Sequence, residues 1–190
     1  MKMNKGDSMI TSFKMAKQYI KADYEKINGK MTFKGFVMSY LFEQGFKYIV
    51  WLRLTQFYWL KKGICMPLFV ISRFILKHYA YKFCYEISYR AEIAPGFSIS
   101  HHGVLIVNSG TKIGKNCWMR PGTCIGKRSV EYDGNAQVIG DNVQIGFGVC
   151  IFGDINIGDN VSIGGNAVVV KDVPSNCVVA GVPAKIIKRL

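Results

Sequence analysis

The sequence predicts a left-handed parallel β-helix preceded by a short α-helical segment. The first observation is a repeat of six residues, because an aliphatic side chain occupies each of Ile139, Ile145, Ile151, Ile157, Ile163 and Val169. A period of six fits neither an α-helix nor a lone strand, and is typical of hexapeptide repeats in which three units close one triangular coil. The second observation is glycine after four of these six residues, where a small residue lets the chain turn a corner. The third is a different, helix-like spacing before residue 84.

Residues 1–84 are predicted to form a basic, aromatic-rich α-helical region. Residues 1–30 are rich in lysine, and the apolar residues of segment 34–61 recur at three- and four-residue steps. Segment 65–76 is strongly apolar but is shorter than the about 20 residues that span a bilayer. We expect it to form a helix that packs on its neighbours or lies on a membrane surface.

The β-helix is expected over residues 85–190. Ile87, Ile93, Ile99 and Leu105 are six apart, and the period slips by two residues before Ile113, Met119 and Ile125. The step from Ile125 to Ile139 is too long for the repeat, which predicts an extruded loop over residues 127–137. The C-terminal tail, 174–190, is expected to end in a short basic helix.

Charge and cysteine content narrow the function classes. Residues 1–85 hold 15 Lys and Arg against 4 Asp and Glu, a net charge of +11, and residues 86–190 hold 10 against 8. The basic half fits an anionic membrane surface, an acidic glycan or an ordinary solvated helical domain, whereas no motif supports nucleic acid. The six cysteines lack metal-site spacing, so we expect apolar packing for Cys124 and Cys150 and a cytoplasmic protein, with contact at the inner membrane left open.

Two adjacent histidines are the candidate catalytic residues. His101 and His102 lie where the two-residue slip begins, and a neutral imidazole suits deprotonation of a hydroxyl. A general base of this kind needs an acceptor on its other ring nitrogen. Glu86 lies fifteen residues before His101, an offset that could bring the two side chains together on neighbouring coils of about eighteen residues. No residue set suggests a metal.

The chain resembles the serine O-acetyltransferase family, and more widely the acetyl-CoA-dependent hexapeptide acetyltransferases of sugars and polysaccharides. The resemblance covers residues 85–190 and rests on EISYRAEIAPGFSISHHGVLIV, the hexapeptide array and KDVPSNCVVAGVPAKII. It implies that His101 is the general base and Glu86 the carboxylate that orients it, with His102 as the alternative base if the alignment is shifted by one residue. The implied reaction is direct acetyl transfer without a metal.

The acceptor site departs from the serine enzymes. Those enzymes have an aspartate before the histidine and an Arg-His pair in the extruded loop, where this chain has Ser100, Asn135 and Ala136. Ser100 and Asn135 offer neutral hydrogen-bonding groups, which suit hydroxyls. The expected acceptor is therefore a sugar hydroxyl on a glycan or polysaccharide precursor.

The resemblance also implies how acetyl-CoA binds. Coenzyme A in this family lies between coils of neighbouring subunits, so a homotrimer is expected, with a dimer of trimers left open. By position, Phe147 and Gly165 would contact the pantetheine, and Lys171, Lys185 and Lys188 would approach the phosphates. These lysines equally fit the solvated charge of a C-terminal tail.

Three interpretations of function follow. The first is an acetyl-CoA-dependent O-acetyltransferase that acts on a sugar or surface polysaccharide precursor. The second is a serine O-acetyltransferase of cysteine biosynthesis with an altered site. The third is a non-catalytic trimeric scaffold, which would not require a histidine and a carboxylate at these positions.

Overall fold

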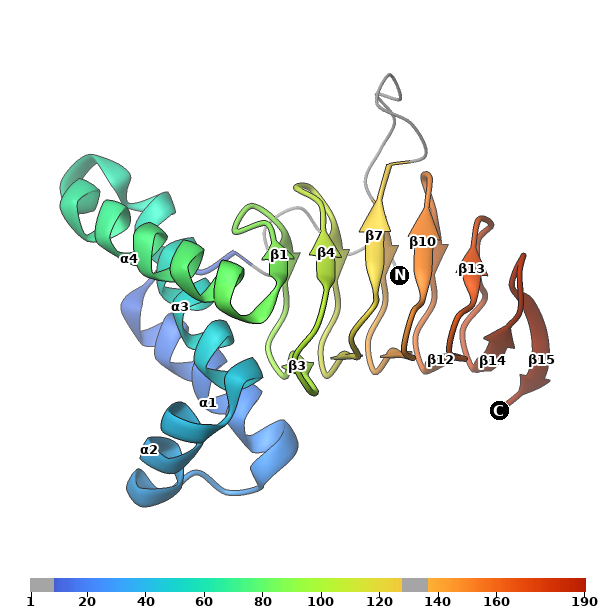
Figure 1. The fold of residues 1–190 in the computed structure, drawn as a ribbon, viewed down its shortest axis with the longest axis horizontal. Coiled ribbons are helices and arrows are strands. Elements are labelled where there is room, and N and C mark those ends of the chain that lie inside the picture. The colour runs from blue at the N-terminus through green and yellow to red at the C-terminus, as the bar shows by residue number, and fades with distance from the viewer. Residues whose placement is uncertain (1–8, 128–136) are drawn as a thin grey trace.

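The computed structural model describes residues 9–127 and 137–190, apart from the side chain of Lys62. Four helices precede a solenoid of short strands, which extends away from them and carries the C-terminus at its far end (Figure 1). The last helix ends at Phe83 and the first strand begins at Tyr85. The extruded loop was predicted over residues 127–137, of which 128–136 lie outside the described residues.

The helices begin and end at residues suited to those positions. Their bounds are α1 (Phe13–Asn28), α2 (Phe33–Phe42), α3 (Gln44–Leu60) and α4 (Lys62–Phe83). The side chains of Ser12 and Thr32 accept hydrogen bonds from the first turns of α1 and α2, as N-cap residues do. The α4 helix is kinked at Cys65, two residues before Pro67, whose ring disfavours a regular helix at that point.

The solenoid has three walls, each a sheet with parallel strands stacked coil upon coil. Sheet A contains β1 (Tyr85–Ile87), β4 (Leu105–Val107), β7 (Cys124–Gly126), β10 (Cys150–Phe152) and β13 (Val168–Val169). Sheet B contains β2 (Glu92–Ile93), β5 (Lys112–Ile113), β8 (Val138–Ile139) and β11 (Asn156–Ile157). Sheet C contains β3 (Ser98–Ile99), β6 (Trp118–Met119), β9 (Gln144–Ile145), β12 (Val161–Ile163), β14 (Cys177–Ala180) and β15 (Lys185–Arg189).

The repeat residues of the sequence form the core of this solenoid. In sheet A, strand register stacks Ile87, Val107, Ile125, Ile151 and Val169 in one inward row, and all five are buried. The predicted β-solenoid is therefore confirmed. The cysteine prediction is wrong in detail, because Cys124 and Cys150 are only half-buried, whereas Cys117 and Cys177 are buried. Burial raises the pKa of the Cys117 thiol to about 12.

The two-residue slip lies between sheets C and A in the first coil. Register pairs Ile99 with Met119 and Val107 with Ile125. Val107 follows Ile99 by eight residues, whereas Ile125 follows Met119 by six. The two extra residues therefore lie in the segment that contains His101 and His102.

Two expectations about chain segments are corrected. The chain ends in strand β15, which pairs antiparallel with β14 and covers the last coil, and not in a basic helix. Gln137 was assigned to the extruded loop, but its side chain is 3% exposed inside the solenoid. Its amide nitrogen donates to the carbonyls of Gly126 and Gly153, at 2.8 and 2.7 Å, and so satisfies two carbonyl groups where the coil turns.

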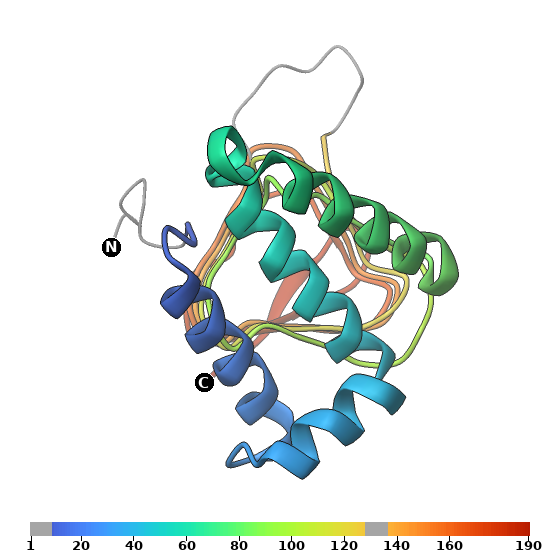
Figure 2. The same ribbon diagram turned by 90° about the vertical axis from the view of Figure 1, so that its left-hand side faces the viewer.

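The helices cover the open end of the first coil. Viewed along the solenoid, α1, α3 and α4 lie across the triangular outline of the coils (Figure 2). The strands β1, β2 and β3 have no preceding coil, so their backbone groups would otherwise remain unpaired at a sheet edge. The helices also cover the apolar interior that the same end would expose.

Side chains of α1 and α3 take the place of the missing coil. Arg53 is fully buried, forms an ion pair with Asp23 at 2.9 Å and donates to the carbonyls of Ile93 and Ala94. Asp23 in turn accepts hydrogen bonds from the Gly96 and Phe97 amides, both at 2.8 Å.

Two neighbouring side chains complete this cap. Gln56 donates to the Ala91 carbonyl at 2.9 Å. The Tyr48 hydroxyl lies within hydrogen-bonding distance of the Tyr85 and Ile87 carbonyls of β1. Burial raises the pKa of the Asp23 carboxyl, while Arg53 and the two amides oppose that shift. We call these side chains, Asp23, Tyr48, Arg53 and Gln56, the coil cap.

The coil cap gives a stability prediction. Arg53→Met should lower the free energy of unfolding by about 3–5 kcal/mol, because it leaves the Asp23 carboxylate buried without its partner. Urea unfolding at fixed protein concentration measures this change. The matched control is the exposed Arg189, for which Arg189→Met should change the free energy by about 0.5 kcal/mol or less. Equal effects of the two substitutions would contradict the capping role.

Candidate active site

The edge at which the chain passes from sheet C to sheet A carries most of the candidate residues. We call it the C–A edge, formed by residues 100–104, 120–123, 146–149 and 164–167. Its corners are stacked by backbone hydrogen bonds, from Gly122 to Val104 at 2.7 Å, from Gly148 to Pro121 at 2.9 Å and from Asn166 to Phe147 at 2.6 Å. Side chains far apart in sequence therefore form one row.

His101 and His102 lie at the first corner of this edge and are exposed. His101 has a left-handed backbone, with φ of 59°, and its carbonyl accepts a hydrogen bond from the Tyr85 hydroxyl. Burial raises the pKa of Tyr85 to about 12, so at neutral pH the hydroxyl keeps the proton that it donates. The next turn is made by Gly103, whose φ is 141°. The extra residues thus form a fixed turn on the solenoid edge.

Four aromatic or charged side chains gather at this turn. The His101 ring stacks on Phe147, with ring centroids 5.8 Å apart and planes inclined by 28°. The guanidinium of Arg120 lies 5.6 Å from the Phe147 ring and 4.4 Å from the Trp118 ring. The Trp118 ring nitrogen donates a hydrogen bond to the Ser100 hydroxyl. The predicted residues Ser100, His101 and Phe147 are therefore brought together.

This cluster combines an exposed imidazole, a cation and an apolar ring. An imidazole can accept a proton from a hydroxyl, and the Arg120 guanidinium can stabilise negative charge that develops nearby. Phe147 is 44% exposed and offers a flat surface to an apolar chain. Among the described residues, no three His, Cys, Asp or Glu side chains are placed to hold a metal ion.

The residues predicted to bind a coenzyme lie at several places. Gly165 lies on the C–A edge, where an added Cβ would be 3.3 Å from the Phe147 carbonyl oxygen. Lys185 and Lys188 pair with Ala180 and Val178 at the C-terminal end of sheet C. Lys171 lies on a different edge, between β13 of sheet A and the Val173 bridge to sheet B. Asn135 lies outside the described residues.

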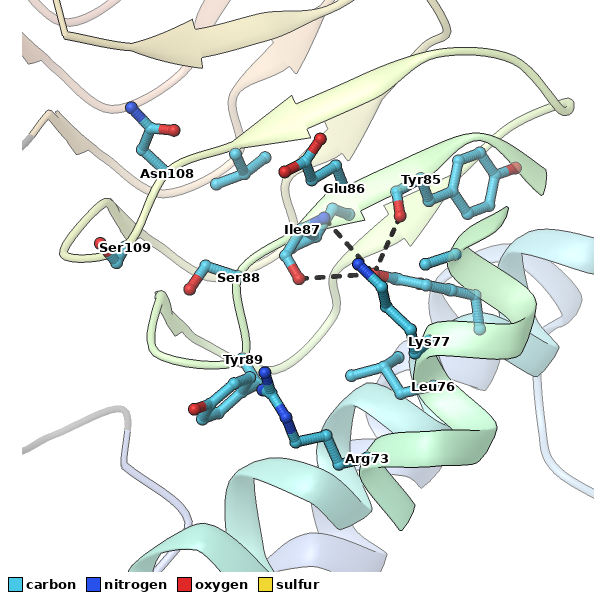
Figure 3. Close-up of a pocket in the computed structure, with 13 residues that line it drawn as sticks. Arg73, Leu76, Lys77, Tyr85, Glu86, Ile87, Ser88, Tyr89, Asn108 and Ser109 are labelled. Carbon is cyan, nitrogen blue, oxygen red and sulfur yellow. Dashed lines mark hydrogen bonds between the residues drawn. The ribbon is translucent and has the colours of Figure 1, made fainter. Parts of the chain in front are cut away.

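Glu86 lies on the outer face of sheet A and is exposed. It lines a pocket between β1 and α4, together with Arg73, Lys77, Ser88 and Asn108 (Figure 3). Within the described part of the chain, Glu86 has no hydrogen bond or ion pair with His101 or His102. The predicted pairing of Glu86 with His101 stays a prediction.

Sequence reasoning missed Trp118 and Arg120. Strand register pairs Ser98 with Trp118, so the first coil contains twenty residues. Applied to Ser100, the same offset identifies Arg120 as its neighbour on the next coil. The sequence shows the two-residue slip, but a coil length of eighteen residues does not place Arg120 beside Ser100, whereas the observed length of twenty does.

Comparison with known proteins gives sequence relatives with named activities. The putative colanic acid biosynthesis acetyltransferase WcaB of Escherichia coli K12 is 34% identical over 133 residues, which cover 67% of this chain and 80% of that protein. A serine acetyltransferase of Synechococcus elongatus is 32% identical over 104 residues, covering 55% of this chain and 43% of that enzyme. The chain thus spans less than half the length of this serine acetyltransferase. No protein-family model matches the chain.

Solved structures with a similar fold are also acetyltransferases. The serine acetyltransferase of Neisseria gonorrhoeae superposes with a TM-score of 0.78 and 26% identity, over 93% of this chain and 66% of that one. The Brucella abortus serine acetyltransferase, solved in complex with coenzyme A, superposes with a TM-score of 0.74 and 26% identity over 91% of this chain.

The first corner gives a second prediction. Gly103→Ala should lower the free energy of unfolding by about 1–3 kcal/mol, because the positive φ disfavours a side chain and the new Cβ would lie 3.0 Å from Pro121 Cβ. Gly63→Ala is the control, since no atom lies within 4 Å of its added Cβ, and alanine suits a helix. Thermal and urea unfolding measure both variants. Full stability of Gly103→Ala would contradict this description of the corner.

Proposed function

The chain belongs to the hexapeptide-repeat acetyltransferases that include WcaB and the serine acetyltransferases, and we propose that it transfers an acetyl group from acetyl-CoA to a sugar hydroxyl. The exposed imidazole of His101, held at a two-residue insertion on the solenoid edge, is the observation that carries this proposal. Ser100 presents a neutral hydroxyl where the serine enzymes have an aspartate, which supports a hydroxyl acceptor over an amino acid. The left-handed sense of the coil is part of the same proposal and rests on the hexapeptide spacing.

In this mechanism His101 removes the proton of the acceptor hydroxyl as its oxygen attacks the thioester carbonyl of acetyl-CoA. The carbon–sulfur bond then breaks and the acetyl group becomes an ester of the acceptor. The departing coenzyme thiolate takes the proton from the His101 imidazolium and leaves as the free thiol. Arg120 and nearby donors stabilise the negative charge on the thioester oxygen. Glu86 orients the imidazole once its carboxylate reaches the ring, and His102 is the alternative base.

The coenzyme is proposed to lie along the C–A edge. Its pantetheine would pass the exposed Phe147 ring and the open backbone at Gly165, while Lys185 and Lys188 approach its phosphates near the end of sheet C. Lys171, on another edge of the solenoid, would reach the coenzyme from a neighbouring protomer. We propose a homotrimer for this arrangement, with a dimer of trimers as the alternative.

Contact with a membrane surface is a further part of the proposal. No helix in residues 9–127 and 137–190 is long and apolar enough to cross a membrane. The outer side of α4 nevertheless exposes Val70, Ile71, Phe74 and Tyr81. Apolar side chains beside a basic region suit peripheral contact with anionic lipid.

A serine acetyltransferase is the second candidate, because the solved structures with similar folds carry that activity in their names. A non-catalytic trimeric scaffold is the third. Release of free coenzyme A from acetyl-CoA separates the three. We expect release with sugar nucleotides or oligosaccharides and none with millimolar L-serine. Release with serine but with no sugar would favour the second candidate, and the absence of release with every acceptor would favour the third.

Replacement of the base tests the mechanism. His101→Ala should lower turnover by about 10²–10⁴-fold, with unchanged unfolding, because proton removal by a positioned side chain is lost. Glu86→Gln should lower turnover less. The His102→Ala variant is the matched control, since it removes the adjacent imidazole. Loss of activity in His102→Ala with activity retained in His101→Ala would assign the base to His102.

A further inference from the structure

A pocket of about 320 Å³ lies between α4 and the outer face of sheet A. Its walls carry Arg73 and Lys77 from α4, Glu86 and Ser88 from the first coil, and Asn108 and Ser109 from the second (Figure 3). Its volume is at the lower end of the range for small-molecule sites. We call it the α4 pocket.

The helix wall of the α4 pocket is cationic. Arg73 and Lys77 are one helical turn apart, and neither is in an ion pair among the described residues. The Arg73 guanidinium lies over the Tyr89 ring, 4.8 Å from its centroid. A guanidinium stacked on a ring still presents its in-plane N–H groups, which match a carboxylate or phosphate.

The opposite wall carries the Glu86 carboxylate on β1 and, in the turns that follow β1 and β4, neutral hydrogen-bonding groups. Ser88, Asn108 and Ser109 place two hydroxyls and an amide around the pocket. Such groups pair with sugar hydroxyls as both donors and acceptors. The combination of the two walls suits a sugar that carries a negative charge.

A second hollow lies beside the α4 pocket, since Tyr89 lines both. This hollow, of about 120 Å³, is lined by Trp59, Tyr89 and Arg90, so that Tyr89 belongs to both. The Tyr89 and Trp59 ring centroids are 5.8 Å apart, and Arg90 lies 5.9 Å from the Trp59 ring. Aromatic faces pack well on the C–H faces of sugar rings. The two hollows together suit more than one sugar unit.

Tyr85 connects the α4 pocket to the candidate base. It lines the pocket, and its hydroxyl donates to the carbonyl of His101. Tyr85 therefore contacts both the pocket and the turn that carries the imidazole. A sugar bound in the pocket could extend a hydroxyl toward that corner.

We propose that the α4 pocket binds the acetyl acceptor, and that this acceptor is an acidic oligosaccharide whose anionic group is held by Arg73 and Lys77. The inference rests on the proposed function, because the acceptor is defined by that reaction. The anion is a uronate carboxylate or a sugar-linked phosphate, which share the same recognition by the two cations.

Calorimetric titration without coenzyme tests this proposal on the full chain, with tetragalacturonate, neutral maltotetraose and inorganic pyrophosphate as probes. We expect tetragalacturonate to bind at least tenfold more tightly than maltotetraose. Arg73→Gln should weaken that binding by about ten- to a hundredfold, the loss expected for a charge-assisted hydrogen bond. Pyrophosphate binding that depends on Arg73, without tetragalacturonate binding, would support the phosphate form of the anion.

Lys82→Gln is the matched control, because Lys82 is an exposed cation of the same helix outside the pocket. Equal weakening by Lys82→Gln and Arg73→Gln would overturn the proposal, as would equal affinity for maltotetraose or no binding of any probe. Unfolding of each variant is followed in parallel, and Arg73→Lys tests the cation where Arg73→Gln fails to fold. Coenzyme A binding to the unsubstituted chain is titrated separately. Absence of that binding would count against the proposed function and not against the α4 pocket as a sugar site.

Discussion

The structure depends on how the first coil is capped. A solenoid coil satisfies its backbone groups through the coils before and after it, and the first coil has none before it. Here Arg53 and Asp23 form a buried ion pair that also bonds to the first coil. The guanidinium donates hydrogen bonds to the carbonyls of Ile93 and Ala94. The carboxylate accepts hydrogen bonds from the amides of Gly96 and Phe97. This exchange fixes the first coil and, through Tyr85, the corner at His101.

The candidate site is a consequence of that fixed coil. The corner at His101 differs from those below it by two residues, so the imidazole can stack on Phe147 of a later coil. On the other side of β1, α4 leaves the pocket that contains Glu86 and the two cations. The same strand therefore contacts both places, because the Tyr85 hydroxyl donates to the His101 carbonyl and Glu86 lines the pocket. Helix α4, which helps to cap the solenoid, forms one wall of that pocket.

The sequence predicted the solenoid well because inward side chains repeat at a fixed interval. It also located the slip at the two histidines, since the interval breaks there. It did not predict Arg120 and Trp118 beside them, because their position depends on the length of one coil. The basic C-terminal segment is predicted to be helical, but it forms strand β15 because it pairs with β14. The α4 pocket forms where a helix packs on a sheet, and the local sequence pattern does not predict how the two elements pack.

The central claim is that an imidazole on the C–A edge and a thioester meet beside the α4 pocket. A crystal structure of the oligomer with coenzyme A tests it most directly. The account predicts the coenzyme along Phe147 and Gly165 with its sulfur beside the His101 ring, on the side that faces the pocket. A coenzyme bound on another edge, with both imidazoles turned away from its sulfur, would contradict it.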